Sequence, residues 1–377
     1  MITKTGIEYS ENSDLSNSST IEENGTVSSI TIPDWEVGVD LYCQAYVIDD
    51  GDRINSTIEH YVDSQSPDYV CISNVSGTNN TFTFTTRKYG NPVAGTYASS
   101  IEYSKDGNTW STLNFNTSTP QDITLQSGEN LYLRNDTGVF NHWDLSKYYV
   151  TTITATHNHT ISGDIMSLLD YTGTDTTLKT GCFYNLFDSN HGLIYAYNLT
   201  MPDTVAERCY AGMFQGCSSM TVPPEELPAL TLADSCYKNM FTGCSALTQA
   251  PDLPARTLAP DCYALMFSNC RSIESIPQLQ ATTLSSGCYY NMFYGCSAIT
   301  EVELPARTLV QQCYYGMFDS CTSLNTVKVY ARDISASYCT EDWLKNVAQS
   351  GTFYNYNNAN FSRGEDGIPT GWTILYS

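Results

Sequence analysis

The chain has 377 residues, enough for two or three domains, and its 17 Lys and Arg against 40 Asp and Glu give a formal net charge of −23. This balance argues against nucleic acid or an anionic membrane surface as a partner, because both require a basic contact surface. Only 15% of the residues are charged, and no apolar run is long enough to cross a bilayer. The abundance of Asn, Thr, Ser and Tyr is typical of β-rich, polar surfaces.

Residues 1–68 are predicted to form a small β module. The stretch 39–47 alternates apolar and polar residues, which is the pattern of a strand with one buried face. Residues 49–52 predict a turn, and residues 54–61 predict the returning strand. A polar hairpin tip is favoured over a calcium site at this acidic turn, because the ligand spacing of a dedicated calcium loop is absent.

A phrase in this module resembles the later strands of fibronectin type III-like modules. It consists of Tyr42, Ala45, Tyr46 and Gly51, with Gln44 where that family usually has Arg. The resemblance implies a partial antiparallel sandwich, because the chain would start at about the third strand. A partner subunit or particle protein would then cover the missing sheet edge, so this module is the candidate anchor.

Residues 69–162 are predicted to form a second β-sandwich-like domain without helices. Two strand-turn-strand patterns are expected, one around the Asp-Gly pair at Gly107 and one around Gly128. The first joins 101–104 to 109–112, and the second joins 123–125 to 131–133. His157-Asn158-His159 has the letters of a nuclease motif but lies in an alternating stretch without the rest of that motif, so no catalysis is expected there.

A repeat dominates the chain from Gly163 onward. Its clearest copy spans 253–270, and the copies centre on cysteines that recur every 25 to 27 residues. These cysteines are Cys182, Cys209, Cys236, Cys262, Cys288 and Cys313. A near-constant period in this range predicts a solenoid, in which each coil stacks on its neighbours. The solenoid would occupy 163–343 with about six coils, begin with a cap near residues 164–169, and end in a C-terminal β cap at 344–377.

Within a repeat, Cys-Tyr-x-x-Met-Phe places apolar residues at i, i+1, i+4 and i+5, which predicts a short helix with one apolar stripe. Glycines such as Gly216 and Gly243 would end this helix. A second Cys follows the first by eight positions, and the apolar residue three positions later predicts a short strand. Of the fourteen cysteines, twelve lie in the repeat half, and their spacing is not that of a zinc site. They are therefore expected to be buried free thiols in the core.

The repeated phrase resembles the BspA-like leucine-rich-repeat family, which is common in surface proteins of gut anaerobes and in virion proteins of their phages. The matching letters are Leu-Pro-Ala-x-Thr-Leu, then Cys-Tyr-x-x-Met-Phe, then Cys-x-Ser-Leu, and they cover about half of the chain. The resemblance implies a horseshoe with one strand and one short helix per coil. The expected fold is therefore mainly β, with two antiparallel β-sandwich-like modules followed by this solenoid and its β cap.

The strand face of the solenoid is the candidate binding surface, because solenoids usually bind ligands on their continuous curved face. Tyrosines at variable positions of the predicted helix add exposed aromatic candidates. The candidate residues are Thr248, Glu274, Thr300, Glu301 and Asn325 on the strand face, and Tyr290 and Tyr315 on the helix. The chain has no nucleophile elbow, phosphate loop or dinucleotide-binding turn. No catalytic residue, metal or cofactor is therefore expected.

These features predict a non-enzymatic attachment protein. Its N-terminal module would join other virion or surface proteins, its solenoid would bind a host glycan, mucus or a surface protein, and association with further copies is compatible with this interpretation. No secretory signal follows Met1, which favours a phage fibre or capsid decoration on the virion surface, because virions leave by lysis. The alternatives are a bacterial cell-surface adhesin whose signal lies outside this numbering and an accessory binding module of a glycan-degrading system.

Overall fold

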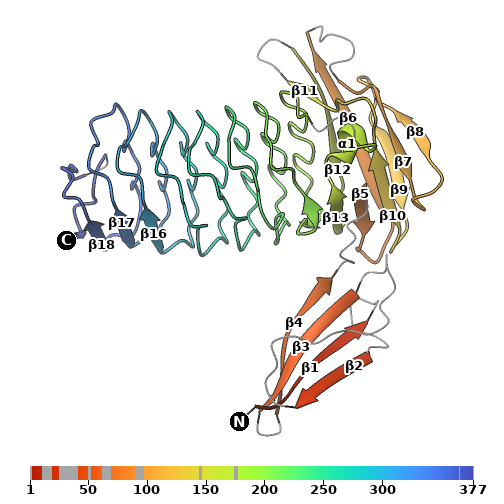
Figure 1. Cartoon of the computed structure of the whole chain (residues 1–377), viewed down its shortest axis with the longest axis horizontal. Coiled ribbons are helices and arrows are strands. Elements are labelled where there is room, and N and C mark those ends of the chain that lie inside the picture. The colour runs from red at the N-terminus through yellow and green to blue at the C-terminus, as the bar shows by residue number, and fades with distance from the viewer. Residues whose placement is uncertain are drawn as a thin grey trace. The chain divides into compact units, whose positions relative to one another are not determined.

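The computed structural model describes residues 2–10, 19–24, 41–49, 52–61, 69–90, 97–143, 147–173, 177–364 and 366–376. Within these residues the chain is mainly β, with several sheets and almost no helix (Figure 1). It divides into two compact units, Met1–Asp68 and Tyr69–Ser377. In the described part of the chain, no helix has the length and apolarity needed to span a membrane.

The first unit contains a four-stranded antiparallel sheet in the order β2-β1-β3-β4. Its strands are β1 (Ile2–Ser10), β2 (Ser19–Asn24), β3 (Leu41–Asp49) and β4 (Asp52–Tyr61). The predicted strand pair is confirmed, because β3 pairs with β4 and Asp49 lies opposite Asp52. The other neighbour of β3 is β1, from the N-terminal end of this chain. The described strands of this unit form one sheet, whereas a sandwich has two, and Gly51 of the fibronectin-like phrase lies outside the described residues.

The second unit begins with two sheets that share one buried core. The first sheet contains β5 (Val70–Asn74), β7 (Ser100–Ser104), β8 (Ser111–Asn114), β10 (Asn130–Arg134) and β13 (His159–Asp164). The second contains β6 (Asn80–Tyr89), β9 (Gln121–Leu125), β11 (His142–Trp143) and β12 (Tyr148–Thr154). Buried apolar side chains from both sheets, such as Ile72 and Leu131 from the first and Phe82 and Ile153 from the second, belong to the same hydrophobic cluster.

One of the two expected hairpins is confirmed and the other is wrong. β7 pairs with β8 as predicted, with Tyr103 opposite Ser111. In contrast, β9 pairs with β6, whereas β10 pairs with β5 and β7 in the other sheet. The chain therefore crosses between sheets near Gly128. The Asn74 amide stabilises this crossing, because its Nδ2 donates to the carbonyl oxygens of Leu125 and Gln126 at 3.3 and 2.8 Å.

Strand β13 belongs both to the two-sheet region and to the repeats. It pairs antiparallel with β5, and parallel with β14 (Leu193–Tyr195) and β15 (Leu199–Thr200). The expected domain boundary between residues 162 and 163 thus lies inside one strand. The buried helix α1 (Ser167–Asp170) follows this strand in the chain and packs against β10, and Ser167 Oγ accepts a hydrogen bond from Val70 N at 2.9 Å. The two-sheet region, rather than residues 164–169 alone, therefore closes this end of the repeats.

From β14 onward the chain forms stacked coils, which follow one another in a row in Figure 1. Four parallel strands lie side by side at the far end: β16 (Glu301–Leu304), β17 (Thr326–Val329), β18 (Thr352–Asn355) and β19 (Thr373–Tyr376). The predicted cap at 344–377 is β as expected. Its strands continue the array in register, however, with Val327 opposite Phe353 and Phe353 opposite Ile374.

The predicted short helices are wrong, because each coil has a chain of turns in their place. Every fourth residue of this turn chain has positive φ, as at Arg208, Gly212 and Gly216 with values of 53°, 64° and 72°. Successive backbone N–H groups therefore alternate between a hydrogen bond within their own coil and one to the next coil. Ala211 N donates to Arg208 O within its coil at 3.2 Å, and Gly212 N donates to Lys238 O of the next coil at 2.8 Å. A repeat of four residues also places i and i+4 on one face, so the apolar spacing fits both structures.

The seventh turn chain shows that the array passes the expected boundary between residues 343 and 344. Positive φ recurs there at Tyr338, Asp342 and Asn346. Cys339 is buried at the position that the first Cys of a repeat occupies, and its carbonyl accepts a hydrogen bond from Tyr314 N at 3.0 Å. The coil conformation therefore continues into residues where the repeated sequence pattern is largely lost.

Backbone hydrogen bonds join the turn chains of successive described coils, and strand ladders join the other side near the two ends of the array, which is nearly straight (Figure 1). Adjacent chains joined by backbone hydrogen bonds lie about 4.8 Å apart, and here this applies to the turn side as well as the strand side. A helix on one side would need about 10 Å and would bend the stack toward the strands. The expected horseshoe is thus replaced by a row of coils, and the expected curved strand face is nearly flat.

Two columns of aromatic rings run through the core of the array. In the second column, adjacent rings have centroids 5.5 to 5.7 Å apart and interplanar angles of at most 9°. The first column contains Phe183, Tyr210, Tyr237, Tyr263, Tyr289 and Tyr314, and the second contains Phe187, Phe214, Phe241, Phe267, Phe293 and Phe318. Each coil therefore adds an equivalent apolar layer that is stabilised by its neighbours.

The thirteen described cysteines are buried, as predicted. The second Cys of most repeats also makes a hydrogen bond between coils. Cys270 Sγ donates to Phe241 O, and Cys296 Sγ donates to Phe267 O, both at 3.0 Å. Burial raises the pKa of the Cys288 and Cys296 thiols from 9.0 to about 12. These side chains are therefore packing groups, and their thiolate forms are disfavoured in the fold.

The glycines of the turn chain provide a test of the coil contact. Gly287 and Gly243 both have positive φ, 62° and 77°. A Cβ at Gly287 would collide with Asp261 Oδ1 of the preceding coil, whereas a Cβ at Gly243 would lie 3.8 Å from its nearest neighbour. Both Ala variants share the cost of positive φ, and the partly exposed Asp261 side chain can rotate away, so Gly287→Ala should lose only about 0.5–1.5 kcal/mol more stability than Gly243→Ala in urea unfolding. Equal losses would contradict this packing.

The raised thiol pKa values predict an alkaline loss of stability. Because the pKa of Cys288 is about 12 in the fold and 9.0 without burial, its contribution is complete below pH 9 and is lost as the pH rises toward 12. Melting temperatures measured at increasing pH should fall within this window. Iodoacetamide should label these thiols only after unfolding, whereas an exposed thiol introduced by Thr248→Cys should react in the folded protein. Equally fast labelling of the native cysteines would show that they are accessible.

Candidate functional site

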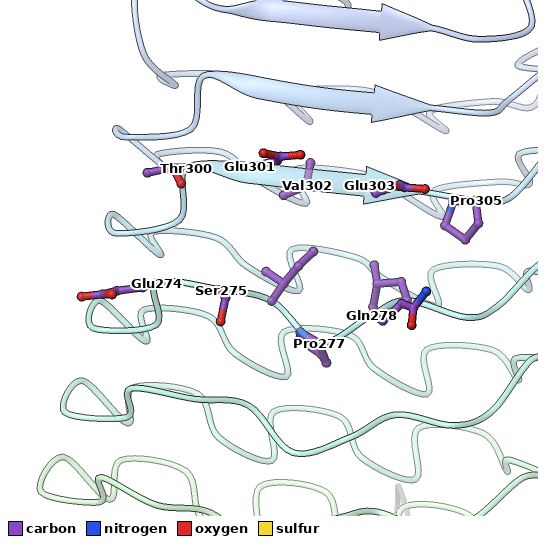
Figure 2. A pocket seen from close by; sticks show the side chains of 11 residues that line it. Glu274, Ser275, Pro277, Gln278, Thr300, Glu301, Val302, Glu303 and Pro305 are labelled. Carbon is purple, nitrogen blue, oxygen red and sulfur yellow. The ribbon is translucent and has the colours of Figure 1, made fainter. Parts of the chain in front are cut away.

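A groove of about 310 Å³ lies on the strand side of the coil array. Figure 2 shows its two walls: Glu274, Ser275 and Gln278 belong to one coil, and Glu301 and Glu303 belong to β16 in the next. In β16, outward-facing Glu301 and Glu303 alternate with buried Val302 and Leu304. The period-two pattern of the strand therefore presents both carboxylates on the solvent side.

The groove exists because the parallel ladder stops at β16. This strand pairs with β17 on one edge, but no backbone hydrogen bond among the described residues joins it to 274–279. Pro277 lacks an N–H and cannot donate to such a ladder. The segment from Ile273 to Leu279 is also one residue longer than the equivalent segment from Ile299 to Leu304. The two chains therefore lose register and separate at this point.

The free edge of β16 offers backbone groups to the groove. Thr300 O and Leu304 O accept hydrogen bonds from β17 and its flank, from Thr326 N at 3.2 Å and from Tyr330 N at 3.1 Å. In a parallel ladder, the intervening residues direct their N–H and C=O groups to the opposite edge. The backbone donors and acceptors of Glu301 and Glu303 therefore face the side of the groove.

Side chains from the β17 coil lie beside both β16 carboxylates. Lys328 Nζ forms an ion pair with Glu301, and this hydrogen bond raises the pKa of Lys328. Tyr330 lies close enough to Glu303 that burial, together with the charge of Glu303, raises the pKa of its hydroxyl. Tyr330 therefore stays protonated at neutral pH, and the Glu301 carboxylate is oriented by its ion pair before any ligand arrives.

Three tyrosines lie on the same face of the array as the groove, in the coils of β17 and β18. The rings of Tyr330 and Tyr356 stack with centroids 4.6 Å apart, and Tyr354 lies 6.1 Å from Tyr356. Tyr330 N donates to Leu304 O and Tyr356 N donates to Val329 O, at 3.1 Å each. These bonds place Pro305, Tyr330 and Tyr356 in one row across the strands.

The seven predicted binding residues do not form one site. Glu274, Thr300 and Glu301 meet at the groove, as members of its lining. Thr248 is exposed one coil earlier, where its Oγ1 donates to Thr221 O at 3.4 Å. Asn325 is exposed one coil later, and its N donates to Thr300 O at 3.0 Å.

Tyr290 and Tyr315 lie on the turn side of the coils and are not part of the groove lining. Their rings stack with centroids 4.8 Å apart. Sequence reasoning missed Gln278, Glu303, Lys328 and the three tyrosines of the strand side. A usable signal was present at 353–356, where Tyr354 and Tyr356 alternate with buried residues.

The histidine pair has a structural role. His159 in β13 is buried and packs edge-on against Phe82, with ring centroids 4.9 Å apart. Burial lowers its pKa to about 4, so it is neutral at physiological pH. His157 O accepts hydrogen bonds from Asn80 Nδ2 at 2.8 Å, and its contact with His159 Nδ1 is 2.9 Å. Across the described residues, His, Cys, Asp and Glu side chains form no group of three suited to hold a metal ion.

The strand side therefore combines carboxylates, an amide and backbone groups at the groove with aromatic rings in the neighbouring coils. Such a set can hold a ligand by hydrogen bonds and stacking. No protein-family model, curated protein or solved structure matches this chain. The geometry of the groove and its neighbours is therefore the basis for inferring what the chain does.

Proposed function

We propose that this chain is a non-enzymatic attachment protein that presents the strand side of its coil array to a ligand on another surface. The observation that carries this proposal is the groove between 274–279 and β16, set in an array whose turn chains are hydrogen-bonded from coil to coil. A site held on such a rigid support keeps its shape before binding, which lowers the entropy cost of association.

The coil array is assigned to the BspA-like leucine-rich-repeat solenoids on the strength of the repeated phrase. Its period and its stacked aromatic columns support this assignment. The chain of turns in place of the short helix is a departure from the expected coil. The two β modules that precede the array are assigned as sandwich-like supports that carry it.

The setting we favour is a phage virion, with the chain as a fibre component or capsid decoration. The net charge of −23 supports display in many copies, because like-charged copies repel one another and remain soluble. Strands β2 and β4 are the edges of the described sheet of the first unit, and an edge strand offers backbone groups to another chain. This unit is therefore the proposed anchor to other virion proteins.

The attachment function predicts that changes on the strand side weaken binding and that changes on the turn side do not. Thr300→Arg would place a long cationic side chain in the groove and should weaken binding of the full chain to a mucin-coated surface by about tenfold or more. The double variant Tyr290→Ala with Tyr315→Ala changes the turn side and is the matched control. Surface plasmon resonance would measure both.

Three outcomes would contradict the proposal. They are an absence of binding to mucin and to bacterial envelopes, an equal loss in both variants, and release of reducing sugar from the surface, which would indicate an enzyme. The virion setting has a separate test. Antibodies against the chain should label purified phage particles in immunogold electron microscopy, whereas labelling confined to bacterial envelopes would favour the adhesin.

A further inference from the structure

We infer that the groove binds an uncharged sugar residue, stacked on Tyr330 and hydrogen-bonded to Glu303 and Gln278, and that it rejects sialylated and sulfated sugars. This inference rests on the proposed attachment function, because it names the ligand class of the same site. It is argued from the size of the groove, its aromatic flank and its charge.

The size of the groove favours a small ring over a protein surface. Its volume of about 310 Å³ is at the lower end of the range for small-molecule pockets, roughly 300–1,000 Å³. A specific protein partner would instead need about 800 Å² of surface on each side. One or two sugar residues of a longer chain fit such a space, and the rest of the glycan would extend along the strand side.

Tyr330 supplies an aromatic face next to the groove. One face of its ring stacks on Tyr356 at 4.6 Å, on the β18 side. Because the strand order is β16-β17-β18, the opposite side of the ring lies toward Pro305, which lines the groove, and the half-exposed ring leaves part of its surface open to a ligand. The face of an aromatic ring carries partial negative charge and attracts C–H groups. A pyranose has such a face, so its ring can pack against Tyr330 while its hydroxyls point into the groove.

The polar groups of the groove match hydroxyls, which both donate and accept hydrogen bonds. Glu303 faces outward from β16 into the groove, and a carboxylate accepts strong, charge-assisted bonds from hydroxyl donors. Gln278 on the opposite wall brings an amide that can donate as well as accept. The free backbone N–H groups of β16 add further donors for the oxygens of the sugar.

The charge of the groove selects against anionic sugars. Glu274, Glu301 and Glu303 line it, whereas the nearby cation Lys328 is paired with Glu301. The whole chain carries −23, which adds a long-range repulsion. A sialic acid carboxylate or a sulfate would be placed beside like charges without a cation to compensate it. The uncharged form of the same glycan should therefore bind more tightly.

A glycan array with matched neutral, sialylated and sulfated versions of each glycan tests this inference on the full chain. Neutral glycans should bind at least tenfold more tightly than their anionic versions. Tyr330→Ala should weaken neutral-glycan binding about tenfold, and Tyr330→Phe should weaken it less, because the aromatic ring remains. Tyr290→Ala, in the stacked pair on the turn side, is the matched control and should bind like the unaltered chain.

The double variant Glu301→Gln with Glu303→Gln removes two negative charges from the groove. It should therefore reduce the preference for neutral over sialylated glycans. Melting temperatures close to that of the unaltered chain would show that each variant is folded. Tight binding of sialylated or sulfated glycans would overturn the inference and leave the attachment function intact. So would binding to mucin or envelopes without binding to any arrayed glycan, or equal effects of Tyr330→Ala and Tyr290→Ala. Failure to bind any surface would overturn the attachment function itself.

Discussion

The hydrogen bond from alternate amides of one coil to the carbonyls of the next is the constraint on which the coil array depends. It is possible because every fourth residue of the turn chain adopts positive φ, as at Gly212 and Gly216. Alternate N–H groups then point toward the carbonyl groups of the next coil. The same bond sets equal spacing on the two sides of the array, which keeps it straight. In-register stacking then brings equivalent aromatic rings and cysteines into columns, so the composition of the core follows from the backbone geometry.

The groove lies where the parallel ladder of β16, β17, β18 and β19 ends. One additional residue between Ile273 and Leu279, together with Pro277, removes the ladder on one edge of β16. Strands β17 and β18 are paired on both edges, so they have few backbone groups left to offer a ligand. The groove and the local loss of ladder hydrogen bonds therefore have the same cause.

The two-sheet region and the array belong to one continuously packed unit. Strand β13 contributes to both, and a single hydrophobic cluster extends from Val70 to Trp372. A ligand bound at β16 is therefore supported by a continuous core that reaches back to Tyr69, at the start of the second unit. The proposed attachment function requires a domain that carries load from the bound surface, and a continuous core of this kind suits such a domain.

The sequence by itself determined the repeat, the buried cysteines, the β-rich first half and most of the strands, because these depend on local apolar patterns that any register preserves. It did not distinguish a helix from a chain of turns, since Cys262 and Met266 share a face under a period of 3.6 and under a period of four. Alternation in β9 and β10 showed which residues are buried but not that the two strands join different sheets. Only the tertiary structure placed Tyr330 beside Glu303 and separated Tyr290 from the groove, because those neighbours are set by the register between coils about 25 residues apart.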